Sequence, residues 1–111
     1  MAWLGRFDLQ AKSTTFGAMA HDQRSLAVLS TWTDQLNAAL HPLDILLSGV
    51  DALSIFPQLA RGSPLDVLRS VTDTQIAEIA KAANRYCETD RIDASHIRLA
   101  VERTKWHWQE G

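Results

Sequence analysis

Cysteine, proline and glycine are scarce in this sequence, and each scarcity narrows the class of protein. Cysteine occurs once, at Cys87, so the chain can form neither an internal disulfide nor a cysteine-rich zinc site. A lone thiol also favours a reducing compartment, and we therefore expect an intracellular protein that is not secreted. The three prolines and five glycines are dispersed, and no stretch of the chain is compositionally biased or repeated.

Long hydrophobic runs and an excess of one charge are also lacking. The 11 basic and 13 acidic residues give a net charge of -2, which is too small for sequence-blind binding to DNA or to an anionic membrane. The most apolar window, residues 43–59, is interrupted by Asp44, Asp51 and Pro57, so we expect no membrane span. The first residues carry Arg6 with no apolar run behind it, which argues against a signal peptide.

The composition that remains is that of one folded helical domain. Hydrophobic residues make up 46% and charged residues 22% of 111 residues, close to the globular average. No segment alternates like a strand, so we predict an all-α fold with four helices in residues 22–111. Residues 1–21 lack periodicity, and we predict an irregular arm with hydrophobic anchors at Trp3, Leu4, Phe7 and Phe16.

The first two helices are predicted from apolar spacing and from Pro42. Apolar residues recur every three or four positions from Asp22, and Pro42 requires this first helix to end at His41. Because proline suits a first helical turn, we predict a second helix from Pro42 to Pro57. The predicted buried stripes are Leu26, Leu29, Trp32, Leu36 and Leu40, then Leu43, Leu46, Leu47, Val50 and Leu53.

The third predicted helix is long and the fourth is short. Ser63 followed by Pro64 is typical of a helix start, and apolar spacing then continues to Tyr86, so we favour one unbroken helix over residues 64–88. A capping box at residues 72–75 would instead divide it into two helices, and the sequence leaves this alternative open. After a charged connector, Asp93 can cap a last helix that buries Ile97, Ala100, Val101, Thr104 and Trp108.

Two phrases in the second half resemble a core histone. The segments IAEIAKAANR (residues 76–85) and RIDASHIRLAV (residues 91–101) are similar to the end of the central helix, the second loop and the third helix of that family. The predicted succession of a medium, a long and a short helix also resembles the histone fold. This resemblance implies an obligatory dimer clasped across the central helices, with Arg61 and Arg91 in the connectors that face DNA phosphates in histones.

The charge departs from that family and favours protein assembly over DNA wrapping. Residues 42–111 carry ten acidic and eight basic side chains and no basic tail. We therefore predict a non-enzymatic subunit, without cofactor or metal, that pairs with itself or a related protein inside a larger complex. The residues predicted to form the partner interface are Leu68, Ile76, Ile79, Ala83, Tyr86, Trp106 and Trp108.

The end of the chain permits two interpretations. Trp106 and Trp108 follow Arg103 and Lys105, and exposed aromatic and cationic side chains of this kind anchor partners or stack on bases. The alternative is that Trp108 packs inward while Lys105 compensates the helix dipole. A nucleic-acid-binding module is therefore a second hypothesis, with contacts from Arg61, Arg91, Arg98, Arg103 and Lys105, and with Arg85 as a further cation.

Catalytic and metal-binding patterns are weak. Arg91 and His96 resemble the Arg-x4-His pair of HEPN ribonucleases, which makes an RNA-cleaving enzyme the third hypothesis. The structural alternative is that Arg91 pairs with a carboxylate and that His96 packs at the start of a helix. The phrase at residues 74–80 also opens many helix-turn-helix motifs, but no short turn follows it. The four histidines lie on separate segments, and Cys87 is expected to be a buried apolar residue.

Overall fold

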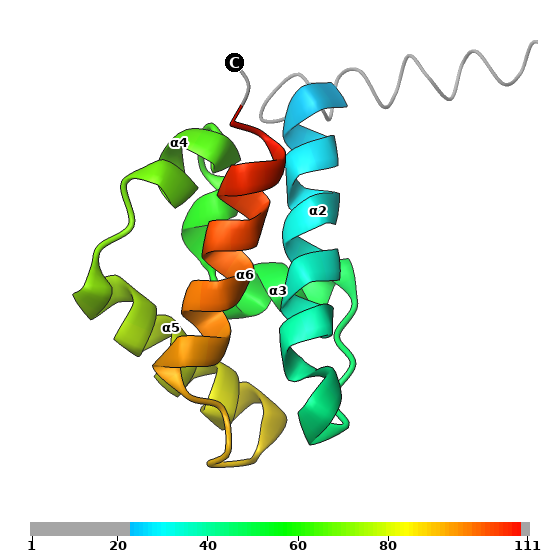
Figure 1. Cartoon of the computed structure of the whole chain (residues 1–111), viewed down its shortest axis with the longest axis vertical. Coiled ribbons are helices and arrows are strands. Elements are labelled where there is room, and N and C mark those ends of the chain that lie inside the picture. The colour runs from blue at the N-terminus through cyan, green and yellow to red at the C-terminus, as the bar shows by residue number, and fades with distance from the viewer. Residues whose placement is uncertain (1–22, 110–111) are drawn as a thin grey trace, which may run out of the picture.

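A computed structural model describes residues 23–109, which fold into helices joined by short turns, with no strand in that range (Figure 1). The all-α class is therefore confirmed. The predicted arm, with Trp3, Leu4, Phe7 and Phe16, lies outside the described residues. The α-helices are α2 (Gln23–Leu40), α3 (Gly49–Ile55), α4 (Pro64–Arg69), α5 (Asp73–Cys87) and α6 (Ala94–His107), and the 3-10 turns are η1 (His41–Leu43) and η2 (Pro57–Ala60).

Helices α2 and α6 lie side by side and antiparallel, and they form the main packing pair of the fold (Figure 1). Their contacting faces bury large side chains from α2 and smaller ones from α6, and the buried hydroxyl of Thr104 donates to the carbonyl of Ala100 at 2.7 Å. The first and last predicted helices are thus confirmed. Leu26 is an exception: it is exposed because the buried face of α2 is centred on Trp32 and Leu26 lies to one side. The buried residues are Val28, Leu29, Trp32, Leu36, Ala39 and Leu40 on α2, and Ile97, Ala100, Val101 and Thr104 on α6.

The second predicted helix is wrong over its first half. After η1 the backbone turns at Asp44, which has a left-handed φ of 65°, and α3 begins only at Gly49. The backbone of Leu47 is bound by a side chain instead of by a helical turn. The Asn37 amide on α2 donates to the Leu47 carbonyl at 2.8 Å and accepts from the Leu47 N–H at 2.7 Å. Leu46 and Val50, which were predicted to be buried, are 84% and 74% exposed.

The third predicted helix is broken, so the capping-box alternative is correct. Helix α4 ends at Arg69 and α5 starts at Asp73, and the two helices point in different directions (Figure 1). Thr72 accepts from the Gln75 N–H at 3.2 Å, and the Gln75 side chain accepts from the Thr72 N–H at 2.8 Å. These bonds satisfy the first free N–H groups of α5 and so favour a new start over continuation. The expected medium, long and short succession is absent.

The break changes the surroundings of the predicted interface. Leu68 on α4 and Ile76, Ile79 and Ala83 on α5 are all buried in the core of the chain itself. The bend lets α4 and α5 turn their apolar faces toward α2, α3 and α6, so these four side chains pack within the chain itself. Tyr86 and Trp106 remain exposed, and Trp108 is half-buried.

The connector between α5 and α6 is fixed by one side chain. The Asn84 amide donates to the Ile92 carbonyl and accepts from the Ile92 N–H, both at 2.9 Å. Asp93 then caps α6 as predicted. Within residues 23–109, none of the helices is long and apolar enough to pass through a lipid bilayer.

Candidate partner-binding surface

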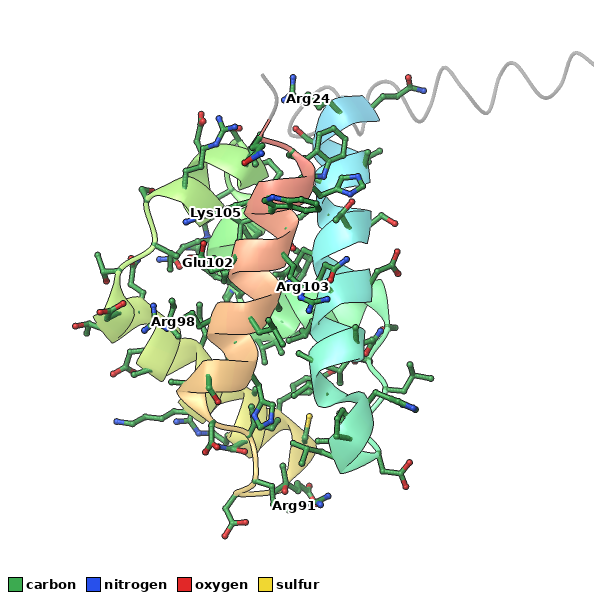
Figure 2. The ribbon with its side chains drawn as sticks, in the orientation of Figure 1. Arg24, Arg91, Arg98, Glu102, Arg103 and Lys105 are labelled. Carbon is green, nitrogen blue, oxygen red and sulfur yellow. The ribbon has the colours of Figure 1, made fainter. Side chains whose placement is uncertain are left out.

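The C-terminal end of α6 borders an open hollow of about 780 Å³. Figure 2 shows Arg24 on α2 and Lys105 on α6 toward this end of the molecule, with Arg103 nearer the middle of α6. We call this region the C-terminal surface, and its lining residues are Gln35, Arg69, Glu102, Arg103, Lys105, Trp106, His107 and Gln109.

Trp108 holds the helices around this surface together. Its indole N–H donates to the Thr31 hydroxyl at 3.2 Å, and its carbonyl accepts from the Arg69 guanidinium at 3.2 Å. The Arg24 guanidinium lies over the indole ring, 5.5 Å from the centroid, in a cation–π contact. Trp108 therefore joins α2, α4 and α6, which corresponds to the inward-packing alternative, and its partners in the fold are residues distant in sequence.

Trp106 behaves differently, although it is only two residues away. Its side chain is 72% exposed, the largest exposed aromatic surface among the described residues. Arg103, one turn earlier on α6, makes no hydrogen bond or ion pair with any residue between 23 and 109. An indole and a guanidinium that are both open to solvent are the side chains most enriched among interface hot spots.

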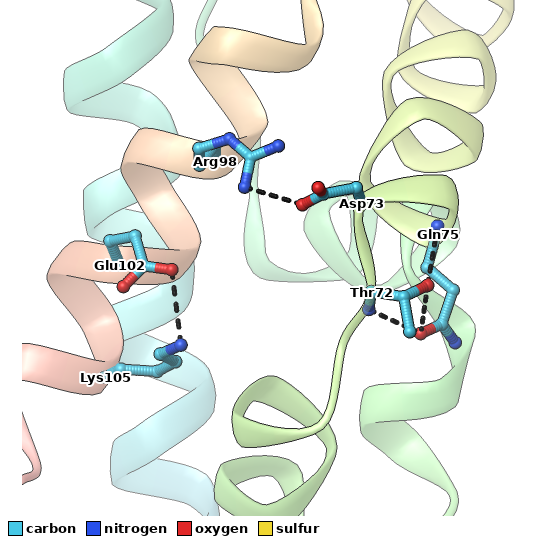
Figure 3. Close-up of polar contacts among 6 residues, drawn as sticks. All are labelled: Thr72, Asp73, Gln75, Arg98, Glu102 and Lys105. Atoms are coloured by element: carbon cyan, nitrogen blue, oxygen red, sulfur yellow. Dashed lines mark hydrogen bonds and ion pairs between the residues drawn. The ribbon is translucent and has the colours of Figure 1, made fainter.

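The charge of the C-terminal surface is positive. Three basic side chains line the hollow against one acidic side chain, Glu102. Glu102 is already engaged, because Lys105 pairs with it at 3.2 Å along the same helix (Figure 3). The Arg69 guanidinium donates to the Trp108 carbonyl. This contact contains no carboxylate, so it does not neutralise the charge of Arg69. The surface is therefore suited to an acidic group.

The cations predicted for nucleic acid do not gather in one place. Arg91 lies at the opposite end of the molecule from Lys105 and donates to the Leu43 carbonyl at 2.9 Å (Figure 2). Arg98 pairs with Asp73 on α5 at 2.9 Å (Figure 3), and Arg61 is exposed in the turn before α4. Of the predicted set, Arg103 and Lys105 line the C-terminal surface.

The predicted nuclease pair is engaged in structural contacts. The Nδ1 atom of His96 accepts from the Asp93 N–H at 2.9 Å, as part of the capping box that starts α6. The Arg91 guanidinium contacts a backbone carbonyl rather than the carboxylate expected as its structural partner. Elsewhere in residues 23–109, no three His, Cys, Asp or Glu side chains lie close enough to hold a metal ion.

A second exposed apolar region lies around the start of α3. We call it the α3 surface and define it by Leu46, Val50 and Tyr86, together with Asp51, whose carboxylate accepts from the Tyr86 hydroxyl. This bond is the main cause that lowers the pKa of Asp51, followed by the Ser48 N–H that donates to the same carboxylate. The same bond raises the pKa of Tyr86 above its usual value. The adjacent Cys87 is half-buried, and burial raises the pKa of its thiol, with a smaller effect from the Asp51 charge.

The Asp51–Tyr86 bond should make the stability of the chain depend on pH. The folded-state pKa of Asp51 lies below the usual aspartate pKa of 3.8, so the bond stabilises the fold above pH 3.8 and is lost as the pH falls through the lowered pKa. We expect Tyr86→Phe to be less stable than the wild type at neutral pH, with a difference that shrinks in acid. Urea unfolding of both proteins over a pH series measures this, and a difference that stays constant into acid would contradict the assignment.

No family model, curated protein or solved structure matches the chain, so the functional argument rests on these two surfaces.

Proposed function

We propose that this chain is a non-enzymatic interaction subunit that docks an acidic segment of a partner protein on the C-terminal surface. The observation that carries the proposal is the exposure of Trp106 beside Arg103, whose charge has no partner among residues 23–109. A tryptophan and an arginine in this arrangement can bury a large apolar area and pair with a carboxylate in one contact.

This proposal keeps the assembly role that the histone resemblance implies. It places the partner contact on the C-terminal surface and not on the apolar residues of α4 and α5. The core position of Leu68, Ile76, Ile79 and Ala83 makes them packing residues. Of the residues predicted for the interface, Trp106 is the exposed one on the C-terminal surface, and it is the partner contact in this proposal.

An acidic protein segment fits the C-terminal surface better than nucleic acid does. Nucleic-acid affinity depends on many phosphates being neutralised along a continuous stripe of cations. The hollow offers three cations against one carboxylate, and Arg91 and Arg98 are directed elsewhere. A few cations around one aromatic side chain are typical of a protein contact.

The test is a titration of the full chain, labelled with ¹⁵N, with a short glutamate-rich peptide that contains one phenylalanine. We expect shifts of the Trp106 indole N–H and of the backbone amides around Arg103. We expect Arg103→Glu to weaken binding by roughly tenfold, the equivalent of one lost hot-spot contact.

Arg98→Glu is the matched control, because Arg98 lies on the same helix, is exposed and pairs with Asp73 outside the hollow. It should leave binding within about twofold of the wild type, since exposed ion pairs contribute little. The proposal is wrong if the peptide shifts no signal at the C-terminal surface or if the two variants behave alike. Oligonucleotide binding that falls steeply with salt would favour the nucleic-acid alternative instead.

A further inference from the structure

We infer that a phosphate group on the acidic partner segment binds between Arg24 and Arg69, in a second hollow that adjoins the C-terminal surface. This inference rests on the proposed function and specifies the chemistry of the partner. The evidence is the charge of this hollow, the way in which its two guanidinium groups are held, and its position.

The second hollow lies between the start of α2 and α4 and has a volume of about 380 Å³. We call it the α2–α4 hollow. Three of its lining side chains, Val28, Pro64 and Leu65, are buried and belong to packed parts of the two helices. Small-molecule sites range over roughly 300–1,000 Å³, so a hollow of this size is suited to one small group and not to a strand of nucleic acid.

Two cations and one carboxylate face the α2–α4 hollow. Arg24 comes from α2 and Arg69 from α4, and the carboxylate belongs to Asp66, one turn before Arg69. Neither guanidinium forms an ion pair with Asp66 or with any other carboxylate of residues 23–109. The hollow is therefore net positive, and an anion placed between the two arginines relieves the repulsion of their like charges.

Trp108 holds both guanidinium groups in place. The Arg24 guanidinium lies over its indole ring, 5.5 Å from the centroid, and the Arg69 guanidinium donates to its backbone carbonyl at 3.2 Å. Neither contact involves a negative charge. Because each guanidinium has five N–H donors, N–H groups remain for a further acceptor. Side chains that are already positioned lose little conformational entropy when a ligand binds.

A phosphate monoester matches these groups better than a carboxylate does. At neutral pH it carries a charge of about -1.5 to -2 and three acceptor oxygens, so it can bind two guanidinium groups at once. Because the hollow is net positive even with Asp66, it attracts this charge more strongly than that of a single carboxylate. Ser63 offers a further donor, since its exposed side chain makes no capping bond to α4.

The position of the α2–α4 hollow connects it to the C-terminal surface. Arg69 lines both hollows, and Trp108 at the end of α6 contacts both Arg24 and Arg69. A peptide segment that fills the first hollow, which Trp106 and Arg103 also line, therefore reaches Arg69. A phosphorylated residue at that point of the segment can place its phosphate group in the second hollow.

The experiment is a titration of the full ¹⁵N-labelled chain with glutamate-rich peptides that contain one phenylalanine and one serine at different spacings. Each peptide is used with the serine free and with the serine phosphorylated. We expect phosphorylation to strengthen binding by roughly tenfold at the best spacing, which corresponds to one added charge-assisted hydrogen bond. The Nε–H signal of Arg24 and the backbone amides around Ser63 should shift with the phosphopeptide and not with its serine counterpart.

Arg24→Gln is the discriminating variant, because Arg24 lines the α2–α4 hollow and does not line the C-terminal surface. It should remove the gain from phosphorylation and leave affinity for the serine peptide within about twofold of the wild type. Arg61→Gln is the matched control, because Arg61 is exposed before α4 and lies outside both hollows, and it should keep the full gain.

Both substituted side chains are exposed, so helical circular dichroism of the variants should match the wild type. If Arg24→Gln loses helicity, Arg24→Lys serves in its place. Lysine keeps the positive charge beside Trp108 but lacks the planar fork that binds two phosphate oxygens. We expect this variant to lose most of the gain from phosphorylation.

The inference is overturned if phosphorylation strengthens binding at none of the spacings, or if Arg24→Gln keeps the gain. Free O-phosphoserine tests the other source of the same chemistry. If it binds as tightly as the phosphopeptide, the hollow is a small-molecule site and the inference is also overturned. Serine peptides that shift the Trp106 indole signal without a gain from phosphorylation leave the proposed function standing, whereas no binding by either kind of peptide contradicts both.

Discussion

Trp32→Ala should lower the free energy of unfolding by about 3–5 kcal/mol, the cost of removing a fully buried large aromatic side chain. Trp32 on α2 is completely shielded from solvent, and its ring meets the Phe56 ring edge-on with the centroids 5.7 Å apart. Its indole N–H also donates to the Ala52 carbonyl at 3.4 Å. The substitution would therefore open a cavity between α2 and α3 and leave that carbonyl without its donor.

Urea unfolding followed by circular dichroism measures this effect, and Trp106→Ala provides the matched control. Both variants lose the same side chain, but Trp106 is 72% exposed and should change the free energy of unfolding by less than about 0.5 kcal/mol. Similar losses at the two positions would contradict the assignment of Trp32 to the core and Trp106 to the surface.

The first and last helices, α2 and α6, could be predicted from the sequence because local signals and tertiary packing agree there. Pro42 ends the first helix within about a residue of the observed end at Leu40, and Asp93 starts the last one. The role of His96 was missed, since a capping box normally has Glu or Gln at that position.

The region from Pro42 to Pro57 could not be predicted from spacing alone. The apolar residues fit a helical period, but the backbone of Leu47 is held by Asn37, a side chain ten positions earlier on α2. A periodicity argument cannot detect such a contact. The pair Ser48 and Asp51 was the visible signal, because it has the spacing of a capping box.

The break between α4 and α5 was visible at Thr72 and Gln75, yet spacing favoured continuity. Both helices bury a face in the same core, with Leu68 before the break and Ile76 after it. The helical spacing of apolar residues therefore continues across residues 70–72, although the helix itself is interrupted there. At this position the capping box, and not the period around it, marked the start of a helix.

The candidate site was predictable only in part. The aromatic and basic run at the end of the chain indicated Arg103, Lys105 and Trp106. Arg69 was missed because it reaches this surface from α4, through a contact with the Trp108 carbonyl that spans 39 positions. Trp108 packs inward, whereas Trp106 faces solvent. The inward position of Trp108 depends on the Thr31 hydroxyl, which the packing of α2 against α6 brings to its indole N–H.

The second large effect is expected at Asn84, the side chain that fixes the turn between α5 and α6. Its amide satisfies both backbone groups of Ile92, whose side chain is buried in the core. Asn84→Ala would leave a buried N–H and a buried carbonyl without partners, so we expect a loss of about 2–4 kcal/mol in the free energy of unfolding.

Asn84→Asp is the matched control, because the carboxylate keeps the acceptor for the Ile92 N–H and loses the donor to its carbonyl. Its second oxygen then faces the Ile92 carbonyl, so we expect a loss at neutral pH that becomes smaller than that of Asn84→Ala once acid protonates the carboxyl and restores a donor. Native-state hydrogen exchange adds a local readout: the Ile92 amide should exchange faster in Asn84→Ala, while the Leu47 amide, held by Asn37, keeps its relative protection. Equal acceleration at both amides would mean that Asn84 acts through global stability alone and does not hold this turn.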